Sequence, residues 1–311
     1  IPSRNRAELF LRALDSVSLQ ITKNKFEFEV IVINDGSCDE QLLQYAEIIS
    51  NYRGIIKNQN LSFRERGHGP SFSRNEGVSL AQGKYICFLD DDDVWLDEEH
   101  LFSLYEFIEV NKPPINTVYL FQQLAETSEG VILTESLWNR DIINALAIID
   151  YQKITKKDVS KSAGFTHLNC LICSRELFLT SGGFDESLRY EEDRDLYFRL
   201  IDQAKQVNIF KKNAAKHYVP NKQLAQNASS SIHEIDKLNM QISSDIKLLS
   251  KLKDRSLRQS ISKHLLNTLT SSVKVSKDLE TRLIFSKLAL SLRFSFKWCM
   301  YVLYLKIKVK F

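Results

Sequence analysis

Residues 85–93 read YICFLDDDD, a short apolar run followed by four consecutive aspartates. Such a run is typical of a buried strand, here one that ends at Leu89. Four adjacent carboxylates repel one another, so a positive charge or protonation has to offset the repulsion. A divalent cation is the simplest such charge, because Mg²⁺ and Mn²⁺ prefer oxygen ligands. The alternative is an exposed acidic turn before a helix that starts near Asp97.

A second strand with a polar end precedes this one. Residues 29–33, EVIVI, are mostly β-branched and run into NDGS, a cluster of turn-forming residues. Residues 7–19 and 71–81 have helical periodicity, so helices and strands alternate. The alternation predicts an α/β fold with a mostly parallel sheet sandwiched by helices. Ligands of such sheets bind at the carboxyl ends of strands, where we expect Asp35 and residues 90–93 to lie.

The composition changes toward the C-terminus. No glycine follows Gly183 and no proline follows Pro220, which predicts a largely helical region. A polar stretch at residues 222–231 is typical of a loop. We therefore expect a first domain of residues 1–225 and a helical, basic extension of residues 226–311.

The composition of the 311 residues is ordinary for a globular protein, with a formal net charge of +3. Five cysteines without framework spacing favour a reduced, cytoplasmic setting over a disulfide scaffold. The sequence has no N-terminal signal pattern and no apolar stretch of about 20 residues, so we expect no membrane-spanning helix. Because Ile1-Pro2 is typical of the end of a strand, we expect part of a first strand to be missing.

Further motifs accompany the aspartates in a fixed order. They are residues 1–6 (IPSRNR), 32–37 (VINDGS), 69–75 (GPSFSRN), 88–93 (FLDDDD), 182–186 (GGFDE), Glu192-Asp193 and Asp195-Leu196. In sequence, order and spacing they resemble the successive motifs of family 2 glycosyltransferases, which are inverting enzymes of the GT-A fold. The resemblance extends over roughly residues 1–217.

The resemblance implies one set of residues that bind a nucleotide-sugar donor: Pro2, Ser3, Arg6, Asp35, Arg74, Asp90 and Asp91. It also implies that Asp92 holds Mn²⁺ or Mg²⁺ on the diphosphate, with His217 as a second metal ligand. Asp193 would be the general base, and Glu192 would support it on the acceptor side. Where the family commonly has an aromatic residue, this sequence has Arg4, so a guanidinium face would replace the stacking ring.

Each of these interpretations has a structural alternative. A single histidine such as His217 is often structural. Residues 191–195, EEDRD, would also suit a charged helix surface. Trp95 and Trp138 could stack on a sugar, although most tryptophans pack in a core.

The implied function is inverting transfer of a sugar from a nucleotide donor to a saccharide or lipid-linked acceptor in cell-surface polysaccharide synthesis. We expect the donor to be UDP-linked. The alternatives are a non-catalytic nucleotide-sugar-binding scaffold and a sugar-phosphate nucleotidyltransferase, although the glycine-rich N-terminal loop of the latter is absent. A dinucleotide-binding dehydrogenase is disfavoured, because Gly67-His68-Gly69 lacks the third glycine and follows no strand.

The C-terminal tail is basic and rich in aromatic residues. No acidic residue follows Glu280, and residues 294–305 read FSFKWCMYVLYL. This pattern is typical of a helix that lies on an anionic membrane surface, and packing on protein is the alternative. We expect no nucleic-acid partner, because no known binding module accompanies the lysines. The expected location is the cytoplasm, with peripheral contact to the inner face of the plasma membrane.

Overall fold

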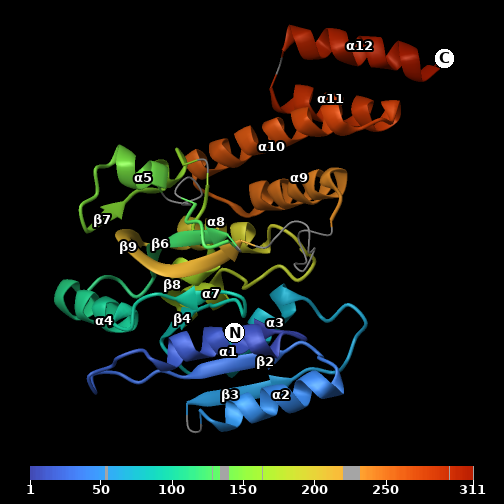
Figure 1. Cartoon of the computed structure of the whole chain (residues 1–311). Helices are drawn as coiled ribbons and strands as arrows, with labels where there is room; N and C mark the ends of the chain where they lie inside the picture. Colours follow the sequence, from blue (N-terminus) through green and yellow to red (C-terminus); the bar gives the residue numbers. More distant parts are fainter. Residues whose placement is uncertain are drawn as a thin grey trace. The chain divides into compact units, whose positions relative to one another are not determined.

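The computed structural model describes residues 1–52, 55–127, 129–133, 140–162, 164–219, 232–293 and 295–310. The chain divides into two compact units, Ile1–Leu224 and Ala225–Phe311 (Figure 1). The loop expected at residues 222–231, which contains the expected domain boundary, lies outside the described residues.

The first unit begins with a parallel three-stranded sheet. Its strands are β1 (Pro2–Ser3), β2 (Val30–Asn34) and β3 (Ile56–Asn60), in the order β1-β2-β3. The helices that alternate with them are α1 (Ala7–Ser18), α2 (Asp39–Ser50) and α3 (Pro70–Leu80). Gly77 of α3 lies against Ile31 and Ile33, whereas Val30 and Val32 pack in a cluster with α1. Helices therefore cover both faces of β2.

A second sheet of the first unit is mixed. Its strand order is β4-β8-β6-β9-β5, with β7 also paired to β9. The strands are β4 (Tyr85–Cys87), β5 (Val94–Trp95), β6 (Thr117–Thr127), β7 (Tyr151–Ile154), β8 (Leu171–Ser174) and β9 (Gln206–Val219). Only β6 and β9 among the described pairs of this sheet run parallel, and their register shifts around Gln122.

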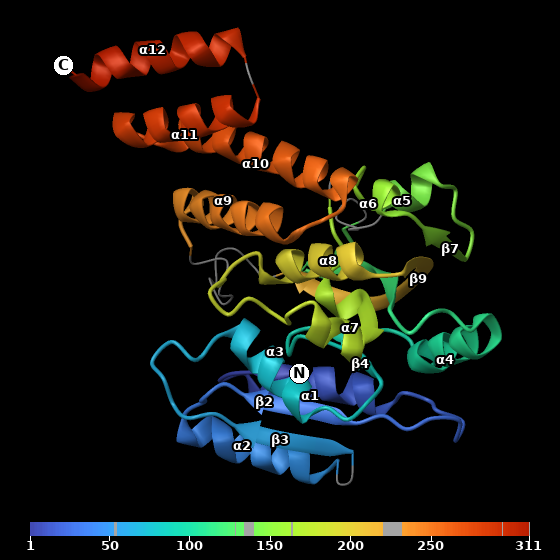
Figure 2. The ribbon, with the colours of Figure 1, turned by 180° about the vertical axis from the view of Figure 1, so that it is seen from behind.

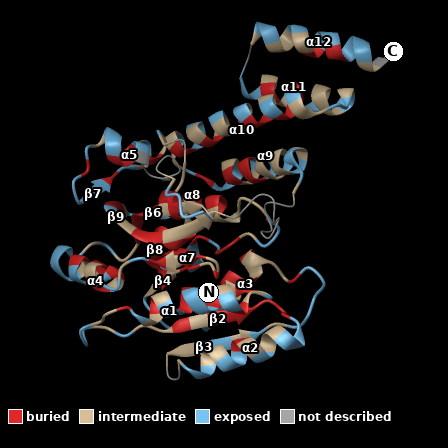
Figure 3. Ribbon diagram, in the orientation of Figure 1, coloured by how far each residue is buried: buried red, intermediate tan, exposed pale blue. Residues whose placement is uncertain are grey.

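Short helices complete the first unit around the second sheet. They are α4 (His100–Asn111), α5 (Arg140–Ala145), α6 (Lys156–Val159), the 3₁₀ turn η1 (Leu168–Cys170), α7 (Arg175–Thr180) and α8 (Glu192–Gln203). Figure 2 shows α7 and α8 side by side, and Figure 3 shows buried residues concentrated in the strands between the helices.

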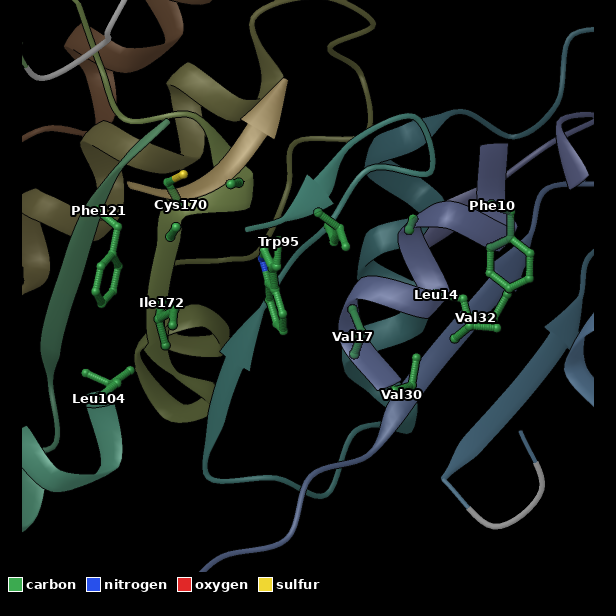
Figure 4. Packing of buried hydrophobic residues seen from close by; sticks show 14 of the residues in the cluster. Phe10, Leu14, Val17, Val30, Val32, Trp95, Leu104, Phe121, Cys170 and Ile172 are labelled. Carbon is green, nitrogen blue, oxygen red and sulfur yellow. The ribbon is translucent and has the colours of Figure 1, made fainter. Parts of the chain in front are cut away.

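The hydrophobic core explains why these segments fold as they do. Phe10, Leu14 and Val17 recur at helical spacing on α1 and are buried with Val30 and Val32 of β2. Figure 4 shows the same cluster continuing through Trp95 to the second sheet, where it includes Phe121, Cys170 and Ile172. The two sheets thus share one core.

The second unit is helical. It contains α9 (Glu234–Lys251), α10 (Arg255–Val275), α11 (Leu279–Leu292) and α12 (Phe296–Lys310). Asp254 and Asp278 accept backbone hydrogen bonds at the starts of α10 and α11, which fixes where these helices begin. Ile242, Leu265, Leu269 and Ala289 form the core of this unit.

The α/β fold and the helical region after it confirm the sequence-based fold class. The parallel arrangement holds in the first sheet, whereas the second sheet is mixed, because β8 inserts antiparallel between β4 and β6. In the described residues, no helix combines the length and hydropathy that a membrane span requires.

Candidate functional site

The turn after β4 places the four aspartates in different surroundings. Asp91 and Asp93 are buried, whereas Asp90 and Asp92 are half-buried. The backbone amide of Asp93 donates to the carbonyl of Asp90 at 3.2 Å, which closes the turn. Because neighbouring side chains of a turn diverge, the carboxylates reach different partners.

Asp91 and Asp92 are held by the loop after β1. Arg6 lies 2.5 Å from Asp91 (Nη2 to Oδ1) and 3.0 Å from Asp92 (Nη1 to Oδ2). The Ser3 hydroxyl donates to Asp91 at 2.5 Å. Burial nevertheless raises the pKa of Asp91 to about 7, although Arg6 acts in the opposite direction. Burial also raises the pKa of Asp92. The structure therefore brings together Ser3, Arg6, Asp91 and Asp92.

Arg74 connects the aspartate turn to the second acidic motif. It is buried in α3, and its Nη2 lies 2.6 Å from Asp90 Oδ1 while its Nη1 lies 3.1 Å from Glu192 Oε1. Burial opposes ionisation of Asp90, but the Arg74 charge prevails and lowers the pKa of Asp90 to about 2. Two acidic motifs about 100 residues apart in sequence thus meet at one guanidinium.

Asp193 lies in the first turn of α8, next to this bridge. Burial, with the charges of Glu192 and Glu191, raises the pKa of Asp193 to about 8. Its Oδ1 accepts a hydrogen bond from the backbone amide of Arg194 at 2.7 Å. A carboxylate whose pKa lies this high retains a proton readily, as a general base must after it abstracts one.

The turn that leads into α8 is fixed by two side chains that the sequence did not single out as functional. Arg199 donates to the carbonyls of Ser181 and Gly183, each at 2.7 Å, and pairs with buried Asp195. Asn75 bonds the backbone of Phe184 with both its oxygen and its nitrogen. Asn75 belongs to the quoted SRN motif, which was the only sequence signal for either residue.

Asp93 is surrounded by nitrogen groups of three residues, two in β9 and one in η1. The His217 Nδ1 lies 3.0 Å from Asp93 Oδ1, the Tyr218 amide donates to the same oxygen at 3.1 Å, and the Asn169 side chain donates to Oδ2. Burial acts against protonation of His217, but Asp93 prevails and raises the pKa of His217. With Nδ1 directed at Asp93, the Nε2 of His217 remains for a ligand, the arrangement that orients metal-binding histidines.

His167 joins this group from the segment before η1. One ligand atom from each of Asp93, His167 and His217 lies within 4.8 Å of the others, close enough for these residues to hold a metal ion. Burial lowers the pKa of His167, so it remains neutral and able to ligate. Among the described residues, Asp92 lies outside this group and is paired with Arg6. Imidazole and carboxylate donors together suit Mn²⁺ better than Mg²⁺.

Asp35 and Arg4 organise the loop that contains Gly67 and Gly69. Asp35 is buried at the end of β2 and accepts from the amides of His68 at 2.7 Å and Gly69 at 2.9 Å. Arg4 donates to the carbonyls of residues 64 and 65. Pro2 is half-buried in β1, opposite Ile33 of β2. Pro2 and Asp35, two of the residues expected to bind the donor, therefore lie at one edge of the first sheet, while Arg4 is engaged with backbone carbonyls.

Of the two tryptophans considered for sugar stacking, the structure describes only Trp95. Trp95 is buried, and its indole Nε1 donates to the carbonyl of Asn169 at 3.3 Å, so it packs in the core. Trp138 lies outside the described residues.

Comparison with known proteins relates the chain to a family. The family model "Glycosyl transferase family 2" matches residues 1–178. The amylovoran biosynthesis glycosyltransferase AmsB of Erwinia amylovora is 40% identical over 95 residues, which are 30% of each chain. An uncharacterised glycosyltransferase of Haemophilus influenzae is 27% identical over 203 residues, 65% of this chain and 61% of the relative. The chain thus spans a third to three fifths of these relatives.

A solved structure shares the fold. The crystal structure of S. aureus TarS 1-349 in complex with UDP-GlcNAc superposes with a TM-score of 0.68, covering 94% of this chain and 79% of TarS 1-349. The sequences are 19% identical, so the likeness concerns the fold. It extends beyond residue 178, where the family model ends.

Proposed function

The chain belongs to glycosyl transferase family 2, and from that premise we propose that it transfers a sugar, with inversion, from a UDP-linked donor to a hydroxyl of a saccharide or lipid-linked acceptor. The observation that carries the proposal is the buried Arg74 bridge, which joins Asp90 to Glu192. Asp90 belongs to the donor side of the proposed reaction, and Glu192 with Asp193 to the acceptor side.

The donor lies, in this proposal, at the carboxyl ends of β1, β2 and β4. Asp35 contacts the edge of the base, with Pro2 and Ser3 beside it. The nucleotide and its sugar are contacted by four residues that the family motifs assign to donor binding: Arg6, Arg74, Asp90 and Asp91. The crystal structure of S. aureus TarS 1-349 is a complex with UDP-GlcNAc, which supports a uridine nucleotide as the first donor to test.

Asp193 acts in this proposal as the general base. It takes the proton of the acceptor hydroxyl as that oxygen attacks the anomeric carbon of the donor, and the bond from this carbon to the diphosphate breaks. Proton abstraction by a positioned base contributes about 10²- to 10⁴-fold. Single displacement with inversion needs no enzyme nucleophile, which is consistent with one acidic motif on each side of Arg74.

Asp92 and His217 are the proposed metal ligands, with Asp93 orienting His217 through its Nδ1. His167 lies near enough to contribute a further nitrogen. When bound, Mn²⁺ or Mg²⁺ neutralises the charge that develops on the leaving diphosphate. The Arg6 ion pair uses Oδ2 of Asp92, so Oδ1 would be the atom that holds the metal.

Titration calorimetry and a transfer assay test the proposal together. We expect UDP-sugars to bind in Mn²⁺ and to bind at least about tenfold more weakly in EDTA or after Asp92→Asn. Equal affinities in Mn²⁺ and EDTA would overturn the metal assignment. Binding without release of UDP in the presence of any acceptor from a panel of saccharides and polyprenyl-linked sugars would favour the non-catalytic scaffold.

A further inference from the structure

Helix α12 has two apolar faces, and one of them is exposed. Val302 and Leu305 are buried, and half-buried Trp298 packs against the core of the helical unit. The other face carries large hydrophobic side chains that are 50–74% exposed: Phe296, Met300, Leu303, Tyr304 and Ile307. At about 100° per residue, these positions fall within one sector of the helix, about opposite to Leu305. The exposed apolar side chains therefore form a continuous stripe, here named the α12 stripe.

Lysines border the α12 stripe on both sides. Lys297 and Lys308 flank it on the Tyr304 side, and Lys306 flanks it on the other, by the same helical geometry. All three lysines are exposed, and the Lys308 ammonium lies 5.4 Å from the Tyr304 ring centre. An apolar stripe between two rows of lysines lets the stripe enter an apolar layer while the ammonium groups remain among polar groups above it.

The charge around the stripe has one sign. Residues 281–311 contain no Asp or Glu, and their basic residues are Arg282, Lys287, Arg293, Lys297, Lys306, Lys308 and Lys310. A partner for this surface must therefore supply negative charge next to an apolar interior. Anionic phospholipids supply both, because their headgroups carry the charge and their acyl chains lie directly beneath.

We propose that the α12 stripe docks on an anionic membrane surface, with Phe296, Leu303 and Ile307 in the headgroup and acyl boundary and the lysines at the phosphates. The helix lies parallel to the surface, because it is too short and too charged to cross it. This docking does not depend on the proposed transfer reaction, but it would keep a lipid-linked acceptor within reach of an enzyme that uses one.

A second copy of the chain fits the same stripe less well. Pairing two α12 stripes brings their lysine rows together, and residues 281–311 offer no carboxylate to offset the repulsion. A nucleic acid would satisfy the lysines but leave the apolar stripe in water. Of these three partners, only the anionic lipid surface matches both the apolar stripe and the lysines beside it.

Sedimentation with vesicles tests the proposal on the full chain. We expect the protein to pellet with phosphatidylglycerol vesicles at low salt and to remain in the supernatant with phosphatidylcholine vesicles. Leu303→Glu/Ile307→Glu should lower the partition coefficient at least about tenfold, because it places two charges in the stripe. Lys306→Gln/Lys308→Gln should lower it about fivefold per lysine, the equivalent of about 1 kcal/mol each.

Matched controls separate docking from general effects of charge. Leu43→Glu/Val110→Glu changes two hydrophobic residues on α2 and α4 that are even more exposed than Leu303 and Ile307. Lys153→Gln/Lys157→Gln removes two exposed lysines of the first unit. Circular dichroism checks that each variant keeps its helical content. Equal pelleting of the stripe variant and its control overturns the proposal. So does a dimer, seen by light scattering, that Leu303→Glu/Ile307→Glu dissociates without any effect on lipid binding.

Discussion

The two compact units differ in what they bury. The first unit buries charged side chains such as Arg74 of α3 and Asp91 and Asp93 of the turn after β4. The core of the helical unit consists of aliphatic side chains such as Leu265 and Leu269. Burying an ion costs several kcal/mol unless close partners offset it. Stability alone therefore does not account for the charged residues of the first unit.

The helical unit shows the opposite use of charge. Its lysines on α12 are exposed, and its aspartates Asp254 and Asp278 begin helices. Asp245 is the exception, since it is buried and bonded to His264 at 2.7 Å. The comparison shows that charged side chains gather at the candidate site in the first unit, whereas in the helical unit they cap helices or lie on the surface. Each of the following variants tests one side of it.

The largest effect on folding is expected from Arg199→Met in the first unit. Arg199 pairs with Asp195, which is fully buried, and holds the carbonyls of Ser181 and Gly183. Without the guanidinium, the buried carboxylate loses its counter-ion, and we expect the free energy of unfolding to fall by about 3–5 kcal/mol. Urea denaturation measures this change.

The double variant Arg199→Met/Asp195→Leu is the control for Arg199→Met. Removing both charges should restore part of the stability, because apolar replacements of a buried pair are often tolerated. A single variant as stable as the parent protein would show that this pair does not hold the turn before α8.

The next largest effect is expected from Asp193→Asn, which keeps the shape of the side chain and removes the proton acceptor. Turnover should fall at least about 10²-fold while the donor Kd changes little, because only a transition-state interaction is lost. Glu192→Gln should cost less. Steady-state kinetics and calorimetry on the same preparations measure both quantities. Loss of donor binding together with turnover would place the base elsewhere.

The raised pKa of Asp193 also gives a pH dependence. A base acts when it is deprotonated, so kcat should rise with pH up to the pKa of Asp193, which burial raises to about 8, and level off above it. The residual activity of Asp193→Asn should lack this rise. A parent profile that is flat between pH 6 and 9 would contradict the assignment.

Local sequence patterns predicted much of the first sheet and its polar edge. Residues 29–33 lie almost entirely in β2, and residues 71–81 overlap α3, which starts with Pro70 at its first position. The segment at residues 85–89 is a strand only as far as Cys87. These elements are encoded by neighbouring residues, because hydrophobic periodicity and turn formers act over a few positions.

Long-range partners could not be predicted in the same way. The Asn169 side chain accepts a hydrogen bond from the Asp90 amide and donates one to the Asp93 carboxylate. Asn169 lies 79 residues from Asp90 and 76 residues from Asp93 in the sequence. Asn169 belongs to residues 168–174, LNCLICS, an apolar run that is typical of a strand and indicates no partner. The antiparallel insertion of β8 between β4 and β6 has no local signal. His167 enters the candidate metal group through the same insertion. Sheet register decides these contacts, and register depends on the whole fold.

A smaller effect is expected from Asp93→Asn. The amide keeps the shape of the carboxylate but removes the charge that orients His217 and raises its pKa. Loss of such an orienting partner weakens metal binding by about 10- to 100-fold. Titration of the protein with Mn²⁺, followed by electron paramagnetic resonance, measures the affinity without donor or acceptor. An unchanged Mn²⁺ affinity would mean that the Asp93 carboxylate only holds β9 and η1 against the turn.

The smallest effect is expected from Ile261→Val in α10, at a fully buried position of the helical unit. Removing one methylene group there should cost about 0.5–1.5 kcal/mol. The same substitution at fully buried Ile201 of α8 is the matched control in the first unit. Because the two positions belong to different compact units, local opening should change only where the methylene is lost. Hydrogen exchange should therefore accelerate in α9, α10 and α11 for Ile261→Val, and in the first unit for Ile201→Val. If Ile261→Val accelerates exchange in β2 and β6 as well, the two units open together. They would then differ in the residue types that they bury, but neither would be stable independently of the other.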